Sequence, residues 1–172
     1  MTADKKEKTS GKISAAYIAL AAAIAALYVV ITVAFAPISY NMMQVRVSEM
    51  LCVLPMFTSA AIPGLFIGCL IANVAGGAIV LDVIFGSLAT LIGAVFAYLL
   101  RKHRWLVPIP TVIANALIVP FVLKYGYGVE EFIPVIAAWV AAGEVISCCI
   151  FGQILAGALK KYKSELDPKN NR

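Results

Sequence analysis

Long stretches without a charged side chain constrain this chain more than any other feature. The first covers residues 13–36, and another continues with few charges from Arg46 to Leu100. A helix needs about 20 predominantly apolar residues to cross the hydrocarbon core of a bilayer, so both stretches are long enough to span it. Across the chain 62% of the residues are hydrophobic and 13% are charged, which leaves too little polar surface to cover a water-exposed globule. We therefore expect an integral membrane protein with a single folded domain.

Turn-forming residues and basic clusters divide the apolar sequence into segments. Pro55 with Thr58-Ser59 indicates one break, and Gly76-Gly77 indicates another. The basic cluster of residues 101–104 should lie on the same cytoplasmic side as the lysine-rich N-terminus, which requires three crossings in the stretch before it. The sequence thus predicts an all-α bundle of six transmembrane helices with both termini cytoplasmic. The expected spans are residues 13–36, 46–58, 60–76, 80–100, 105–123 and 132–159, with cytoplasmic tails at 1–12 and 160–172.

The basic residues indicate orientation and not a nucleic-acid partner. The formal net charge is +5, and a basic chain can bind nucleic acid through its phosphates. Here, however, the lysines and arginines stand in short clusters that flank apolar segments, which is the pattern that orients membrane proteins. We expect this chain to lie in a lipid bilayer and to have no nucleic-acid partner.

Ionisable side chains are few within the expected spans, and each is costly there unless it faces a cavity or a partner. Four polar residues fall at span ends on one membrane face, namely Arg46, Glu49, Asn73 and Asp82. Two simpler readings stay open. Arg46 and Glu49 are three residues apart and can pair along one helix. Asp82 can cap its helix at the positive end of the helix dipole.

Two further polar residues fall deep within the last two spans. Glu144 lies about midway along the sixth span, where no other span offers a basic residue, so we expect it to receive a ligand donor. Asn115 lies midway along the fifth span and can bind the ligand or form an interhelical hydrogen bond. Trp139 can stack on the ligand or anchor the helix at the membrane interface, but it lies roughly 140° around the helix from Glu144.

Small residues recur every four positions and predict close helix contacts. Gly64, Gly68, Ala72 and Gly76 form such a stripe on the third span, and we expect it to pack inside the bundle. The first span carries several alanine rows. We predict that the row of Ala15, Ala19 and Ala23 docks to a second membrane protein, although packing within the bundle stays an alternative.

The chain lacks the motifs of the common catalytic and nucleotide-binding sites. It contains one histidine, and its four cysteines have no CxxC spacing, so we expect small core cysteines and no metal or catalytic residue. It contains no GxxxxGK[ST] loop, which excludes ATP hydrolysis by that route. Any ATP-driven transport would therefore require a partner ATPase.

Several segments carry a resemblance to a known family. They are Arg46-Val47-Ser48-Glu49, Leu54-Pro55, AIPGLFIGC at residues 61–69 and LDVIFGSLATL at residues 81–91. With these segments the chain resembles the QueT family, the substrate-binding S components of energy-coupling factor (ECF) transporters associated with uptake of queuosine precursors. The likeness runs from about Lys12 to Tyr162.

The resemblance implies an S-component fold with a ligand site near the outer face of a bacterial plasma membrane. It implies a transmembrane coupling subunit, the T component, and two cytoplasmic ATPases as partners, so that ATP is used by those partners and this chain needs no cofactor. S components of this kind present a small-residue AxxxA surface on the first helix to the coupling subunit, which maps onto Ala15, Ala19 and Ala23.

The implied ligand is a 7-deazaguanine such as preQ1, preQ0 or queuine. Such a base offers adjacent N–H donors, a carbonyl acceptor and, in its aminomethyl form, a cation. One carboxylate can accept both donors, an arginine or asparagine can donate to the carbonyl, and a second carboxylate can pair with the cation. The residues that supply this set are Arg46, Glu49, Asn73, Asp82 and Glu144.

Other functions stay open at the level of the sequence. An S component for another vitamin or nucleobase would share the architecture. An intramembrane enzyme using its carboxylates, or a purely structural membrane protein, would not need a ligand. Binding measurements on purified protein separate these alternatives.

Overall fold

The computed structural model describes residues 14–39 and 45–162, and the described residues form helices and connecting turns without a strand. The predicted tail at residues 1–12 and most of the tail at 160–172 lie outside them. The elements are α1 (Ala15–Ala34), α2 (Ala36–Ser39), the 3₁₀ helix η1 (Val47–Met56), α3 (Ala61–Ala75), α4 (Val80–Leu99), α5 (Ile109–Gly126), α6 (Ile133–Glu144), the π helix η2 (Val145–Phe151), α7 (Gly152–Leu159) and the short 3₁₀ helix η3 (Lys160–Tyr162). The expectation of an all-α protein is confirmed.

Four of these helices are long and apolar enough to cross a membrane. They are α1, α4, α5 and the continuous helix of residues 133–162 that comprises α6, η2, α7 and η3. Their outward side chains are apolar; Val30, Leu117 and Ile154, for example, are each more than 60% exposed. Such a surface suits lipid and not water.

The second and third expected spans are shorter than a full crossing. The ten residues of η1 rise about 20 Å at about 2.0 Å per residue, and the fifteen residues of α3 rise about 22 Å. The hydrocarbon core is about 30 Å thick. The predicted segment 46–58 is therefore helical, but as a 3₁₀ helix that is shorter than a full crossing, and its role as a span stays a prediction. Pro55 inside η1 cannot donate a backbone hydrogen bond, which disfavours a regular α-helix there.

Two other boundaries differ from the expected ones. Residues 101–108 form turns, so α5 begins at Ile109 and not at residue 105, and it continues to Gly126. Proline is favoured in the first helical turn, where its missing N–H costs nothing, and Pro110 occupies that turn here. The breaks before and after α3 lie where expected, and Gly77 turns the chain with a φ of 72°.

Helices α1 and α3 pack closely through the glycine stripe. A Cβ added to Gly64 would lie 2.8 Å from the carbonyl oxygen of Ala21, and one added to Gly68 would lie 2.8 Å from the Cβ of Tyr28. Only glycine permits such an approach of the two backbones. Gly64, Gly68 and the buried Ala72 therefore pack inside the bundle, as the sequence predicts, and bring Tyr28 over α3. Gly76 is exposed in the turn after α3, so the prediction is wrong for that residue.

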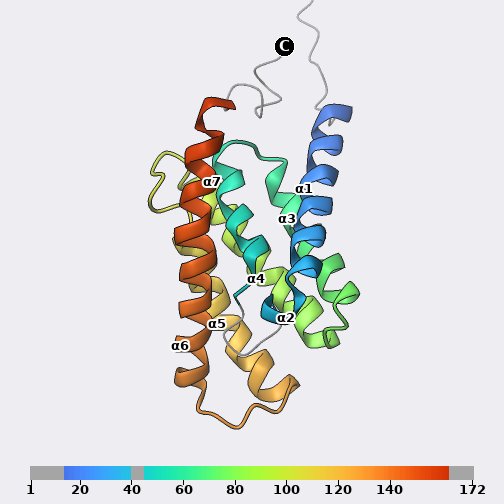
Figure 1. Ribbon diagram of the computed structural model, residues 1–172, viewed down its shortest axis with the longest axis vertical. Coiled ribbons are helices and arrows are strands. Elements are labelled where there is room, and N and C mark those ends of the chain that lie inside the picture. The colour runs from blue at the N-terminus through green and yellow to red at the C-terminus, as the bar shows by residue number, and fades with distance from the viewer. Residues whose placement is uncertain (1–13, 40–44, 163–172) are drawn as a thin grey trace, which may run out of the picture.

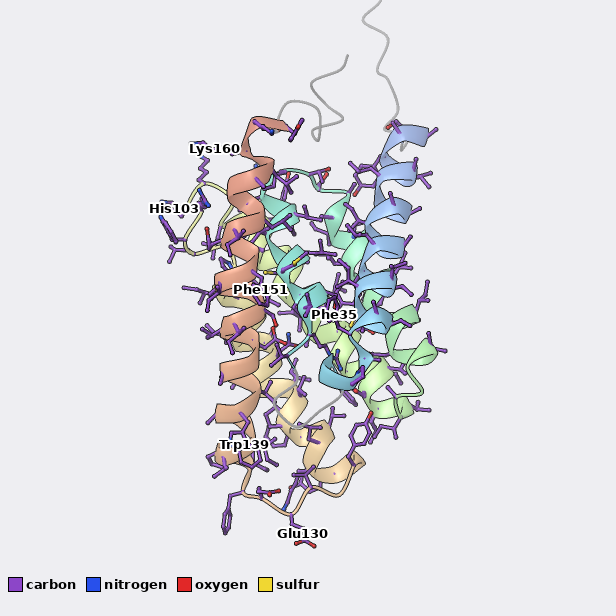
Figure 2. All side chains as sticks on the ribbon, in the orientation of Figure 1. Phe35, His103, Glu130, Trp139, Phe151 and Lys160 are labelled. Atoms are coloured by element: carbon purple, nitrogen blue, oxygen red, sulfur yellow. The ribbon has the colours of Figure 1, made fainter. Side chains whose placement is uncertain are left out.

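The described chain ends lie at the same end of the bundle as His103 and Lys160. The start of α1 and the end of α7 lie together there in Figure 1, and Figure 2 places His103 and Lys160 near the same end. Glu130, in the loop between α5 and α6, lies at the opposite end (Figure 2). This distribution is the one expected when basic segments share a membrane side.

Candidate ligand-binding site

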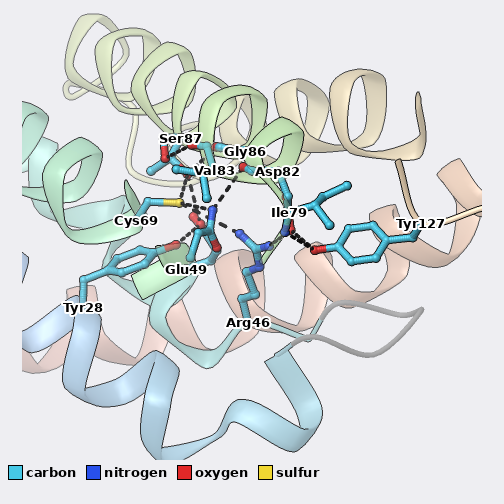
Figure 3. Close-up of polar contacts among 12 residues, drawn as sticks. Tyr28, Arg46, Glu49, Cys69, Ile79, Asp82, Val83, Gly86, Ser87 and Tyr127 are labelled. Carbon is cyan, nitrogen blue, oxygen red and sulfur yellow. Dashed lines mark hydrogen bonds and ion pairs between the residues drawn. The ribbon is translucent and has the colours of Figure 1, made fainter. Parts of the chain in front are cut away.

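A buried polar cluster lies where the start of η1 meets α3 and the start of α4. Its first members are Arg46, Glu49, Asn73 and Asp82, each at most 3% exposed. Figure 3 shows the arginine and both carboxylates pointing toward one another. The structure thus brings together the four residues that the sequence places at one end of the bundle.

Arg46 and Asp82 form the central ion pair of this cluster. The Arg46 Nη2 and the Asp82 Oδ2 are 3.3 Å apart, with 4% and 0% of their side chains exposed. Arg46 forms its ion pair with Asp82 across the bundle and not with Glu49 along its own helix. Asp82 lies in the first turn of α4, at the positive end of the helix dipole, but no side-chain capping hydrogen bond begins that helix. A buried ion pair of this kind requires good geometry and further hydrogen bonds to offset its desolvation.

Tyr127 supplies one of those further hydrogen bonds. Its hydroxyl donates to Asp82 Oδ2 at 3.2 Å and accepts from the Ile79 N–H at 3.3 Å. Partial burial and the nearby Asp82 carboxylate raise the pKa of Tyr127, so the phenol remains a donor at neutral pH. Tyr127 follows α5, next to the loop of Glu130, which places the cluster near the end opposite the basic residues (Figure 2).

Glu49 is held by neutral donors. The Tyr28 hydroxyl donates to its Oε1 at 2.5 Å, and the Thr90 hydroxyl lies 3.3 Å from the same oxygen. Tyr28 is fully buried, and a buried tyrosine hydroxyl usually finds such a partner. Cys69 lies alongside. Its sulfur accepts weak hydrogen bonds from Asn73 and Arg46 and lies 3.4 Å from the Thr90 hydroxyl, whose single hydrogen serves one acceptor at a time.

Two buried acceptor atoms of the cluster have no donor within the described residues. They are Asn73 Oδ1 and Asp82 Oδ1, while the Asn73 Nδ2 donates to the Asp82 carbonyl at 3.2 Å. Both side chains pack on Gly86, where a Cβ would lie 2.9 Å from Asp82 Oδ1 and 3.2 Å from Asn73 Nδ2. Unpartnered buried acceptors are rare, and they are suited to N–H donors brought by a ligand.

Glu144 extends the cluster toward α6. It is 2% exposed and is the last residue of α6, immediately before the π helix η2. π-helical turns occur frequently at functional sites. The Cys148 thiol donates to Glu144 Oε2 at 3.2 Å. Ligand atoms of Glu49, Glu144 and Cys148 all lie within 4.8 Å of one another, so the two carboxylates face the same point.

The other predicted site residues fall in different places. Asn115 is buried and faces the Glu144 carboxylate, although its Nδ2 forms no hydrogen bond of ordinary geometry among the described residues. Trp139 is half-buried in α6 and takes no part in the hydrogen bonds of the described cluster. The structure does not bring it to Glu144, because the regular turns of α6 keep the two on different faces.

The alanines of α1 divide between an inner and an outer face. Ala21 and Ala25 pack on the glycines of α3, whereas the predicted docking residues Ala15, Ala19 and Ala23 are exposed. An apolar groove of about 760 Å³ between α1 and α3 is lined by other alanines of α1, among them Ala22 and Ala26. The predicted docking row is therefore exposed on the described bundle, but it does not line this groove.

Sequence analysis misses the residues that complete the cluster. Tyr28, Thr90 and Tyr127 donate hydrogen bonds to its carboxylates, and Cys148 does the same for Glu144. The cysteines are buried or half-buried and free, in agreement with core packing, but Cys69 and Cys148 also bond the polar residues. The one local signal for Tyr28 and Tyr127 is a phenolic hydroxyl in an apolar setting, which requires a partner.

The family of the chain follows from a comparison of its whole sequence. The family model described as QueT transporter matches residues 18–161. The chain belongs to the QueT transporter family. The matched region contains every residue of the polar cluster, from Tyr28 to Cys148. This QueT protein is accordingly a multi-pass membrane transport protein and not an enzyme. Comparisons with curated proteins and with solved structures gave no match.

Proposed function

We propose that this QueT protein is the substrate-binding S component of an ECF importer and that it binds a 7-deazaguanine precursor of queuosine. The observation that carries the proposal is the buried cluster of Glu49, Asp82 and Glu144, which contains hydrogen-bonding atoms without a partner among the described residues. Asn73 Oδ1 and Asp82 Oδ1 lack donors, and Asn115 Nδ2 forms no hydrogen bond of ordinary geometry, within the described residues. A purine-like base supplies donors and an acceptor of this kind from one rigid ring.

The proposed contacts follow the chemistry of the base. Its adjacent ring N–H and exocyclic amine donate to the acceptors beside Gly86, where Asn73 and Asp82 lie. Arg46 stays paired with Asp82 and holds that carboxylate in place, with its oxygen Oδ1 free of any donor among the described residues. A preformed set of this kind reduces the entropy that binding would otherwise cost.

The proposed transport cycle depends on partners. The chain has no P-loop, so the energy comes from two cytoplasmic ATPases through a transmembrane coupling subunit. The exposed row of Ala15, Ala19 and Ala23 would contact that subunit, because small side chains let helices approach closely in lipid. We propose that six helical segments cross a bacterial plasma membrane with both termini cytoplasmic and the ligand entering from outside.

Equilibrium binding tests the substrate. The detergent-purified protein is titrated calorimetrically with preQ1, preQ0 and queuine and, in parallel, with other vitamins and nucleobases. We expect saturable binding of at least one 7-deazaguanine, which is weakened in Asp82→Asn and unchanged in Lys161→Ala, an exposed residue at the basic end. If a different vitamin binds and no 7-deazaguanine does, the substrate is wrong while the role as an S component stands.

A further inference from the structure

The acidic groups of the cluster differ in how they are neutralised. Asp82 is paired with Arg46. Among the described residues, neither Glu49 nor Glu144 forms a salt bridge; Glu49 is held by the hydroxyls of Tyr28 and Thr90, and Glu144 by the thiol of Cys148. Buried carboxylates are expensive within a membrane unless a cation offsets them. Arg46 acts on Glu49 and Glu144 from nearby but forms its ion pair with Asp82, so a positive charge brought by a ligand would stabilise this side of the site.

The spacing of these carboxylates suits an ammonium group. Charge-assisted N–H···O hydrogen bonds are about 2.7–2.9 Å long, so two oxygens bound to one tetrahedral nitrogen lie about 4.5 Å apart. The ligand atoms of Glu49, Glu144 and Cys148 lie within 4.8 Å of one another. Both carboxylates can therefore bind one small cation. They are too close together to hydrogen-bond to opposite edges of a purine-sized ring.

Asn115 gives a second, independent indication of a ligand at this point. Its side chain is 3% exposed and faces the Glu144 carboxylate, yet its Nδ2 forms no hydrogen bond of ordinary geometry within the part of the chain that the structure describes. A ligand bound at this point can complete the hydrogen bonding of Nδ2 with an acceptor close to its cation. In a 7-deazaguanine with an aminomethyl group on C7, the C6 carbonyl is the neighbour of that group on the ring.

We propose that Glu49 and Glu144 form a subsite for a primary ammonium group, with Asn115 donating to the adjacent carbonyl, and that this protein selects aminomethylated over uncharged 7-deazaguanines. The inference rests on the proposed function. It assigns the cation to Glu144 and Glu49, because Asp82 already has Arg46 as its partner.

A metal ion is the competing occupant of the same three residues. Oxygen and sulfur ligands of zinc lie about 2.0–2.3 Å from the metal, and its sulfur ligand is a thiolate. Here the Cys148 sulfur is 3.2 Å from Glu144 Oε2 and donates to it as a thiol. The ammonium accommodates that hydrogen bond, whereas a metal would have to replace it.

The test compares a charged and an uncharged ligand of the same ring. Purified protein is titrated with the 7-aminomethyl and the 7-cyano base, and the wild type should prefer the aminomethyl base by about 10- to 100-fold, as expected for hydrogen bonds to a charged group. This comparison needs no variant. Equal affinities would overturn the subsite and leave the proposed function intact, whereas no binding of either base would contradict the proposed function itself.

Variants then locate the selectivity. Glu144→Gln should lower affinity for the aminomethyl base and leave that for the cyano base within about threefold, whereas Asp82→Asn should weaken both alike. Glu49→Gln serves in the same way if Glu144→Gln does not fold, as judged by size exclusion and thermal melting. Equal losses for both bases in a folded Glu144→Gln protein would overturn the proposal. A titration with Zn²⁺ alone tests the competing occupant. Tight Zn²⁺ binding that Cys148→Ser abolishes would overturn the proposal, because it would show that these residues bind a metal ion and not an ammonium group.

Discussion

The contact of the cluster with Gly86 leads to a sharp prediction for Gly86→Ala. The added Cβ would lie 2.9 Å from Asp82 Oδ1, 3.2 Å from Asn73 Nδ2 and 3.8 Å from Arg46 Nη1. The first two distances are shorter than ordinary van der Waals contact, so Asp82 and Asn73 must move. The Arg46–Asp82 pair is already long at 3.3 Å, and a shift of a few tenths of an ångström away from Arg46 lengthens it beyond ordinary hydrogen-bond distance without separating the two charges.

The expected magnitude follows from two opposing effects. Alanine is favoured over glycine within a helix by about 1 kcal/mol, which partly offsets an overpacking cost of about 1–3 kcal/mol. The net change in the free energy of unfolding is therefore small. Ligand affinity depends on the placement of Asp82 and Asn73, and losing a hydrogen bond to a charged group costs about 1.5–3 kcal/mol, which corresponds to a loss of about 10- to 150-fold.

Calorimetric titration of the purified variant with the preferred 7-deazaguanine measures this loss. Gly157→Ala is the matched control, because Gly157 is an exposed helical glycine of α7 whose added Cβ would meet only the Arg104 side chain. We expect the control to bind like the wild type. Wild-type affinity of Gly86→Ala, with an unchanged melting temperature, would refute the argument that the crowded contact positions the two side chains.

Three further predictions test other contacts. Tyr28→Phe leaves Glu49 without its shortest hydrogen bond and should lower the free energy of unfolding by about 1–3 kcal/mol, measured by thermal melting in detergent; an unchanged melting temperature would contradict it. Ala19→Leu and Ala23→Leu should abolish ATP-dependent uptake by the reconstituted importer while binding by the isolated protein survives; retained uptake would place the docking surface elsewhere. Asp82→Asn leaves a buried arginine without its counter-ion and should destabilise the fold by about 3–5 kcal/mol, and a melting temperature equal to that of the wild type would show that the pair contributes nothing.

The sequence by itself determines that this protein lies in a lipid bilayer, how many helical segments it has and where most of them begin and end. These properties are local, since a long uncharged run favours a membrane and Gly76-Gly77 favours a turn between two helices. The grouping of Arg46 and Asp82 at one end also follows from the sequence, because counting crossings assigns each charge to a side.

The tertiary structure alone decides which polar groups pair. Hydrogen bonding of Tyr28 to Glu49, and of Tyr127 to Asp82, depends on the rotation of each helix about its axis and on its depth in the bundle. Neither quantity is encoded in the spacing of one segment. The tertiary structure also decides the form of η1, a short 3₁₀ helix enclosed by its neighbours. It likewise brings the Glu144 carboxylate to Glu49, although the two residues are far apart in the sequence. Apolar helix faces are nearly interchangeable in lipid, so the contacts between small side chains on facing helices settle the rotation and thereby the site.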